Sequence, residues 1–81
     1  MSYTPQQHRV NKKLGECLAI ANQHFSREFP CPTVTYKLRG KAAGKAYLQL
    51  NEIKLNQVLF SENEDAFINE VVPHELAHLI T

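Results

Sequence analysis

Residues 71–79 read VVPHELAHL, a run in which apolar residues surround two histidines four positions apart. In a helix each residue turns by about 100°, so His74 and His78 lie about 40° apart on one face and both imidazoles can reach one ion. Apolar residues cover most of the remaining circumference, which is typical of a helix buried at the centre of a domain. The run therefore predicts a central helix that carries a pair of metal ligands.

Glu75 turns the same run into an HExxH motif. Zinc prefers nitrogen ligands at about 2.0–2.1 Å in a tetrahedron, and a catalytic zinc keeps one position open for water. Glu75 lies about 100° from His74, too far round the helix to bind the metal but within reach of that water. The metal lowers the pKa of the water toward about 7, and the glutamate takes its proton and later passes it to the leaving amine. The motif predicts Zn²⁺ as cofactor, His74 and His78 as ligands, and Glu75 as catalytic base.

An HExxH pattern also occurs by chance on ordinary helix surfaces, where both histidines are simply solvated. The apolar flanks favour the metal site, because two histidines and a carboxylate left without partners on a buried helix would be costly. Residues 61–64, Ser-Glu-Asn-Glu, match the capping-box pattern and predict that the helix begins there and runs at least to His78. Pro73 removes one backbone hydrogen bond and crowds the carbonyl of Asn69, which either presents His74 to the metal or makes a tolerated kink.

The chain before residue 60 predicts one more helix and a small sheet. Thr4 followed by Pro5 is a start signal, and apolar residues at three- and four-residue steps predict an amphipathic helix to about Phe25. Runs of branched and aromatic residues then predict three strands at Thr33–Lys37, Ala46–Leu50 and Ile53–Leu55. These elements make a two-layer α+β domain, in which we expect a three-stranded, mainly antiparallel sheet with the HExxH helix packed beneath it.

Composition places the 81 residues among ordinary globular domains. Hydrophobic residues make up 43% and charged residues 21%, which argues against disorder. The formal net charge of +1 gives no global electrostatic reason to expect nucleic acid, and no apolar run approaches the roughly 20 residues of a membrane span. We therefore expect a cytoplasmic protein with no membrane partner, in which Cys17 and Cys31 are free thiols.

Charge is unevenly distributed despite the nearly neutral total. Residues 29–51 contain no acid and four basic side chains, a local charge of +4, interleaved with Tyr36 and Tyr47. The four are Lys37, Arg39, Lys41 and Lys45. Basic groups between aromatic rings can follow a phosphate backbone, so these residues are candidate nucleic-acid contacts. The more ordinary interpretation is a solvated surface loop.

Residues 71–79, with proline directly before the first histidine, resemble the active-site helix of the SprT family, which comprises bacterial SprT proteins and the SprT-like domain of the DNA-repair protease Spartan. Upstream, Phe29–Pro32 is similar to the family's aromatic-Pro-x-Pro turn, and Ile53–Asn56 is similar to the strand that leads to the helix. Gln57 departs from the pattern, which has a proline there. The resemblance implies a zincin-like fold and a zinc metallopeptidase that cleaves protein or peptide substrates, with a link to DNA.

The resemblance also implies a third zinc ligand, a histidine downstream of the helix, and residues 1–81 end before it. Of the other candidates, His8 and His24 lie in polar positions of the first helix and Cys31 lies between prolines, where ligation is not expected. We therefore expect a single partial domain, the N-terminal part of a truncated zincin-like fold, that binds zinc weakly and is itself inactive. The alternative is a DNA-associated binding module with a structural or vestigial metal site. The substrate and the oligomeric state stay open.

Overall fold

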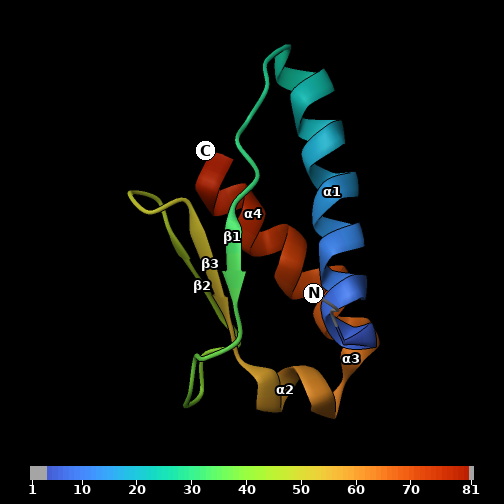
Figure 1. The fold of residues 1–81 in the computed structure, drawn as a ribbon, viewed down its shortest axis with the longest axis vertical. Helices are drawn as coiled ribbons and strands as arrows, with labels where there is room; N and C mark the ends of the chain where they lie inside the picture. Colours follow the sequence, from blue (N-terminus) through green and yellow to red (C-terminus); the bar gives the residue numbers. More distant parts are fainter. Residues whose placement is uncertain (1–3, 81) are drawn as a thin grey trace.

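A long N-terminal helix and a small sheet enclose the helix that carries the HExxH motif (Figure 1). The computed structural model describes residues 4–80. In chain order its elements are α1 (Pro5–Phe25), β1 (Thr33–Thr35), β2 (Gly44–Tyr47), β3 (Glu52–Leu55), α2 (Gln57–Glu62), α3 (Glu64–Ala66), the π-helical segment η1 (Phe67–Val71) and α4 (Val72–Ile80). Helix α4 contacts both α1 and β2, so it lies between the long helix and the sheet. The predicted α+β architecture is confirmed.

Helix α1 begins and ends where the sequence predicts. The Gln7 amide donates a hydrogen bond to Thr4 Oγ1 at 3.1 Å, and the Thr4 amide donates one to Gln7 Oε1, so the two residues form a capping box around Pro5. The helix ends at Ser26, whose φ of 54° is left-handed. Its buried face consists of Val10, Leu14 and Leu18. This face joins the core, which confirms the predicted amphipathic pattern.

The sheet has the order β1-β3-β2 and is mixed. β1 pairs with β3 in parallel, whereas β2 pairs with β3 in antiparallel. The expectation of a mainly antiparallel sheet therefore holds for one of the two pairs. The reason is the connection from β1 to β2, which carries the chain across to the other edge of the sheet, so that β1 never pairs with the next strand in sequence.

The second strand begins two residues earlier and ends three residues earlier than predicted, at Gly44–Tyr47 instead of Ala46–Leu50. The residues after it form the turn into β3, because the Leu50 amide donates to the Tyr47 carbonyl at 3.2 Å and Asn51 takes a left-handed φ of 48°. Leu48 and Leu50 are about two-thirds exposed as a result, at 68% and 67%. Their apolar character suggested a strand, but the sheet does not cover them.

The buried core fills the space between α1, β3 and the C-terminal helices. Ile53 and Leu55 of β3 are almost fully buried, and the rings of Phe60 and Phe67 stack with centroids 4.8 Å apart. The other core side chains are Val10, Leu14, Leu18, Ile68, Val72 and Leu76. Through Val72 and Leu76, α4 is anchored in this core, while the side that bears His74, Ala77 and His78 is exposed.

The helical run before α4 is broken, and its start is not the predicted capping box at Ser61. Helix α2 already begins at Gln57, and Ser61 lies inside it. The break comes at Asn63, whose extended backbone interrupts the helix and whose side chain accepts a hydrogen bond from the Ala66 amide at 3.4 Å. Asparagine side chains bind backbone amides at helix starts as well as serine does, so Asn63 supplies the cap instead.

Asn56, at the junction of β3 and α2, is 1% exposed and binds on both sides. Its Oδ1 accepts hydrogen bonds from the amides of Val58 and Leu59 at 3.1 and 3.2 Å, which caps α2. Its Nδ2 donates to the carbonyls of Gly40 and Ala42 at 3.0 and 3.1 Å. One buried side chain therefore joins the loop between β1 and β2 to the start of the helical half.

A π-helical turn precedes α4 directly. The Val72 amide donates to the Phe67 carbonyl, five residues back, where an α-helix would bond four back. Pro73 follows at once, at the place where its ring would crowd the carbonyl of Asn69 in a regular helix. The wider turn thus accommodates the proline and leaves α4 regular through the HExxH motif. The distortion that the sequence predicts is real, and it lies before the motif.

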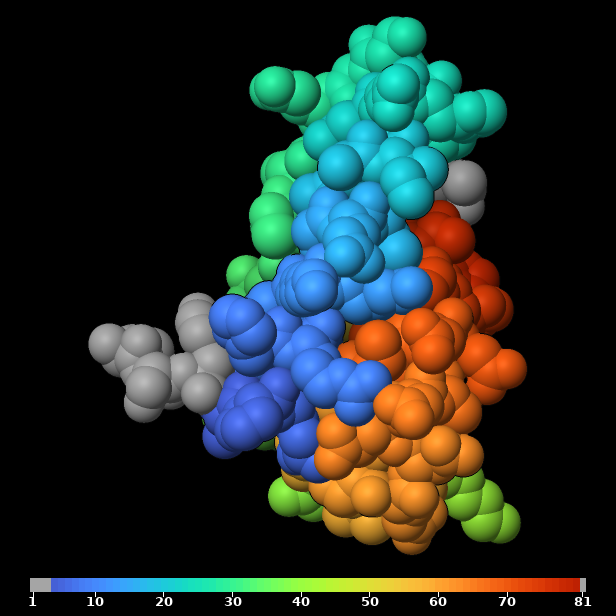
Figure 2. Space-filling model, turned by 90° about the vertical axis from the view of Figure 1, so that its right-hand side faces the viewer, coloured from blue at the N-terminus to red at the C-terminus, as the bar shows by residue number. Residues whose placement is uncertain are grey.

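Ion pairs connect helix α1 to α3. Figure 2 shows residues 60–69 packed beside the N-terminal half of α1. The Arg9 guanidinium lies 2.7 Å from Asp65 Oδ1 and 3.1 Å from Glu64 Oε1. The hydrogen bond to Asp65, aided by Glu64, raises the pKa of Arg9. The pairs are partly exposed and add orientation more than stability.

Among residues 4–80, no helix combines the length and apolar character of a membrane span.

Candidate metal centre

His74 and His78 lie one turn apart on α4 and face each other. Their Nε2 atoms are 3.1 Å apart, and their rings meet edge to face with centroids separated by 4.6 Å. Both side chains are exposed, although the helix that carries them is anchored in the core. The predicted common face is therefore confirmed, and the expectation of a helix buried nearly all the way round is wrong on the side of His74, Ala77 and His78, which are exposed.

The separation of the two ring nitrogens fits two positions of a zinc site. Nitrogen ligands at about 2.0–2.1 Å from a tetrahedral zinc are roughly 3.3 Å from each other. The Nε2 atoms of His74 and His78 are 3.1 Å apart without any rearrangement of the helix. The pair can hold a metal, and the remaining ligands must come from elsewhere.

Glu75 differs from the two histidines because it is buried, with 8% of its surface exposed. It lies against β2 at the bottom of an open pocket of about 520 Å³, which separates the edge strand from the exposed side of α4. The residues that line this pocket are Gly44, Lys45, Ala46 and Tyr47 of β2 and His74, Glu75 and His78 of α4. Both histidines and the glutamate thus meet in one pocket, as the HExxH spacing predicts.

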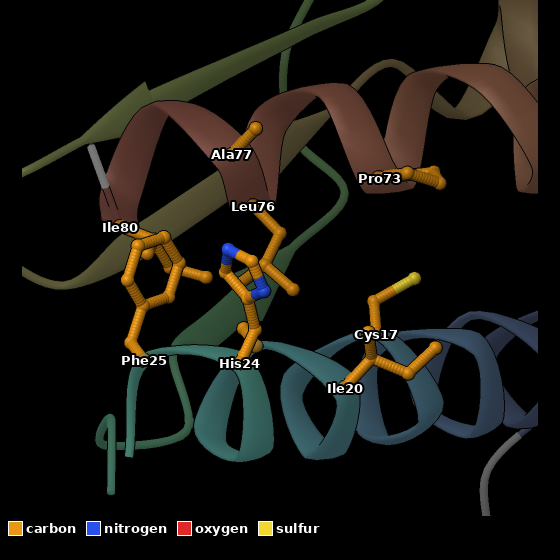
Figure 3. A pocket seen from close by; sticks show the side chains of 9 residues that line it. Cys17, Ile20, His24, Phe25, Pro73, Leu76, Ala77 and Ile80 are labelled. Atoms are coloured by element: carbon orange, nitrogen blue, oxygen red, sulfur yellow. The ribbon is translucent and has the colours of Figure 1, made fainter. Parts of the chain in front are cut away.

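Among the described residues, no group of three or more histidine, cysteine, aspartate or glutamate side chains could hold a metal. His24 belongs to a different, apolar pocket of about 260 Å³ between α1 and α4, where it extends toward α4 beside Phe25 and Leu76 (Figure 3). His8 is exposed on α1, and Cys31 is exposed in the turn before β1. None of the three lines the pocket that holds His74 and His78.

The four basic residues singled out in the sequence are all exposed, and they are spread along the loop and strand between β1 and the β2–β3 turn: Lys37, Arg39, Lys41 and Lys45. Lys45 is the one that lines the pocket with His74 and His78.

Cys17 is half-buried in the apolar pocket of Figure 3, and both cysteines are free thiols, as predicted. Two features of the site escaped the sequence analysis, the contribution of Ala46 and the close approach of Gly44 to Glu75.

Comparison with known proteins now identifies relatives of this chain. A family model described as SprT-like matches residues 14–81. The chain is 55% identical over 74 residues to Protein SprT of Vibrio parahaemolyticus, 58% over 72 residues to that of Pasteurella multocida, and 57% over 74 residues to that of Serratia proteamaculans. These alignments cover 91%, 89% and 91% of the chain but 45%, 44% and 44% of the relatives, so the chain spans just under half their length. No solved structure gives a significant match. Because the family model covers most of the sequence, this chain belongs to the SprT-like family.

Proposed function

We propose that this chain is the HExxH-bearing part of a zinc-dependent peptidase domain. The observation that carries the proposal is the pair of Nε2 atoms 3.1 Å apart on His74 and His78, with the buried Glu75 lining the same pocket. This is two-thirds of the ligand set of a zinc peptidase, together with a carboxylate that does not itself bind the metal. Membership of the SprT-like family supports a metal-dependent activity.

In this proposal His74 and His78 hold the ion and Glu75 moves the proton. A bound zinc would polarise the substrate carbonyl and acidify a water molecule. The Glu75 carboxylate would accept the proton of the attacking water at one oxygen and donate it to the nitrogen of the leaving amine. Its burial against β2 restricts its rotamers, so the carboxylate is oriented toward the pocket before substrate arrives.

The substrate would be a protein segment in extended conformation. β2 is an edge strand of the sheet, and all four of its residues line the pocket that holds Glu75. An extended peptide can add to such an edge through backbone hydrogen bonds, which places its scissile bond beside the histidines. Tyr47 and Lys45 would then contact substrate side chains at the rim of the pocket. Backbone recognition of this kind suits a broad range of protein sequences.

The chain is expected to bind zinc with at most micromolar affinity, because two imidazoles supply half a tetrahedron. Titration of residues 1–81 with Zn²⁺ in a calorimeter should give one site that disappears in His74→Ala and in His78→Ala. His24→Ala is the matched control and should leave the affinity unchanged, since His24 lies in the separate apolar pocket. Binding that resists chelators, or that survives His74→Ala, would refute this ligand assignment.

A second candidate function is DNA association, favoured by the four exposed basic side chains between residues 37 and 45. Lys41→Glu combined with Lys45→Glu should weaken binding to a labelled DNA duplex and lower the slope of log affinity against log salt by about 2. The control reverses the same charge on α1, with Lys12→Glu and Lys13→Glu. Equal losses in both double variants, measured by fluorescence anisotropy, would mean that total charge and not this loop governs binding.

A further inference from the structure

Gly44, the first residue of β2, lies so close to Glu75 that a Cβ at this position would require its neighbours to shift by a few tenths of an ångström. A Cβ built at Gly44 would be 3.0 Å from Glu75 Cγ, 3.1 Å from Val71 Cγ1 and 3.3 Å from Leu55 Cδ2. Carbon atoms in good contact are about 3.5–4.0 Å apart, so all three approaches are too short for an unaltered structure. The space beside Glu75 is available because residue 44 has no side chain.

Backbone conformation does not require a glycine at this position. Among the described residues, a left-handed φ occurs at Ser26, Gly40 and Asn51, and Gly44 is not one of them. Alanine could therefore adopt the same backbone angles without strain. The requirement at residue 44 is one of space, imposed by the three neighbouring side chains.

Of these three neighbours, Glu75 is the one that would move most. Leu55 is fully buried in the core, and Val71 has a branched β-carbon with few alternative rotamers. Glu75 has a longer side chain whose end reaches the open pocket. A methyl group at residue 44 would therefore shift the glutamate most, while Val71 and Leu55 give by less.

We propose that Gly44 is a positioning residue: it lets the edge strand close on α4 and so holds the Glu75 carboxylate beside His74 and His78. The expected effect on catalysis rests on the proposed peptidase function, whereas the close contact between Gly44 and Glu75 rests on packing alone. A glutamate acting as general base must lie within hydrogen-bond reach of the proton that it takes, so a small displacement is enough to slow the reaction.

A double-mutant cycle on residues 1–81 tests the geometry without any activity. Gly44→Ala should lower the urea midpoint of unfolding, and this shift should shrink to about half or less in Glu75→Ala, which removes the atom 3.0 Å away. Gly15→Ala is the matched control: a Cβ there meets no atom within 4 Å, so it should raise the midpoint equally in both backgrounds. If Gly44→Ala prevents folding, adding Val71→Ala relieves the 3.1 Å contact and keeps the one to Glu75. Equal shifts in both backgrounds would overturn the proposal.

The consequence is measured on a chimera in which this chain continues into the remainder of Vibrio parahaemolyticus Protein SprT. Gly44→Ala should lower kcat about tenfold or more while KM and zinc affinity stay within about twofold, and Gly15→Ala should change none of them. An unchanged kcat would overturn the positioning role even if the cycle shows coupling. A chimera that cleaves nothing although the cycle shows coupling would instead overturn the proposed function and leave the Gly44–Glu75 contact established.

Discussion

Asn56→Ala is expected to lower the free energy of unfolding by about 3–5 kcal/mol. The substitution removes four hydrogen bonds at a site that is 1% exposed: two that cap α2 and two that hold the carbonyls of Gly40 and Ala42. The two amides and two carbonyls then lose the side chain that satisfied them, and the space left at a fully buried site lowers the stability further. A domain of this size has a total stability of roughly 4–12 kcal/mol, so the substitution removes between a quarter and all of it. Urea denaturation followed by circular dichroism measures the loss.

Asn63→Ala provides the matched control for that experiment. Asn63 also caps a helix, but it is exposed, and its side chain accepts a single cap hydrogen bond, from the Ala66 amide at 3.4 Å. Its removal should cost about 1 kcal/mol. If Asn56→Ala is no more destabilising than Asn63→Ala, the buried asparagine is not the junction between the two halves that the hydrogen bonds indicate.

Glu75→Gln is expected to abolish peptidase activity in the chimera, by at least about 10²-fold in kcat, while zinc affinity stays within about twofold of the unsubstituted protein. The amide keeps the shape of the side chain but cannot accept a proton, and Glu75 is not a metal ligand in the proposed mechanism. The measurement is cleavage of casein and of a DNA-bound protein, with metal content determined on the same samples. Residues 1–81 alone should be inactive in both assays.

His74→Ala distinguishes loss of the base from loss of the metal, because it should remove both zinc and activity. Chelator should abolish the activity of the chimera, and added zinc should restore it. Strong, chelator-sensitive cleavage by residues 1–81 would contradict the view that two histidines are insufficient. An inactive chimera that still bound DNA would favour the binding-module alternative.

Local signals in the sequence were enough for the parts of the fold that local interactions determine. The start signal Thr4–Pro5 and the apolar stripe predict α1 from its first residue to about Phe25, because both depend on residues a few positions apart. The HExxH spacing predicts that His74, Glu75 and His78 meet, since one helical turn brings them together regardless of the rest of the chain.

Features that depend on distant residues could not be predicted in the same way. The parallel pairing of β1 with β3 depends on where the intervening loop crosses, and Asn56 stabilises that loop from 14 and 16 residues away. The strand shift at β2 arises because Leu48 and Leu50 are left outside the sheet. The role of Gly44 was invisible for the same reason, since a small residue in a strand reveals nothing about which helix approaches it.

The π-helical turn has a consequence for which sequence changes this chain can accept. It contains one residue more than an α-helical turn, so α4 is rotated by about 100° relative to the helix before it. That offset lets Phe67 and Ile68 face the core on one side of the turn and still leaves His74 and His78 facing the pocket on the other. Asn69 and Glu70 are exposed, and many side chains would serve in their places. Deleting either residue would instead set the two halves of the helix in phase and carry His74 and His78, or the core residues, to the wrong side. The turn therefore tolerates substitutions at these two positions but not a change in the number of residues.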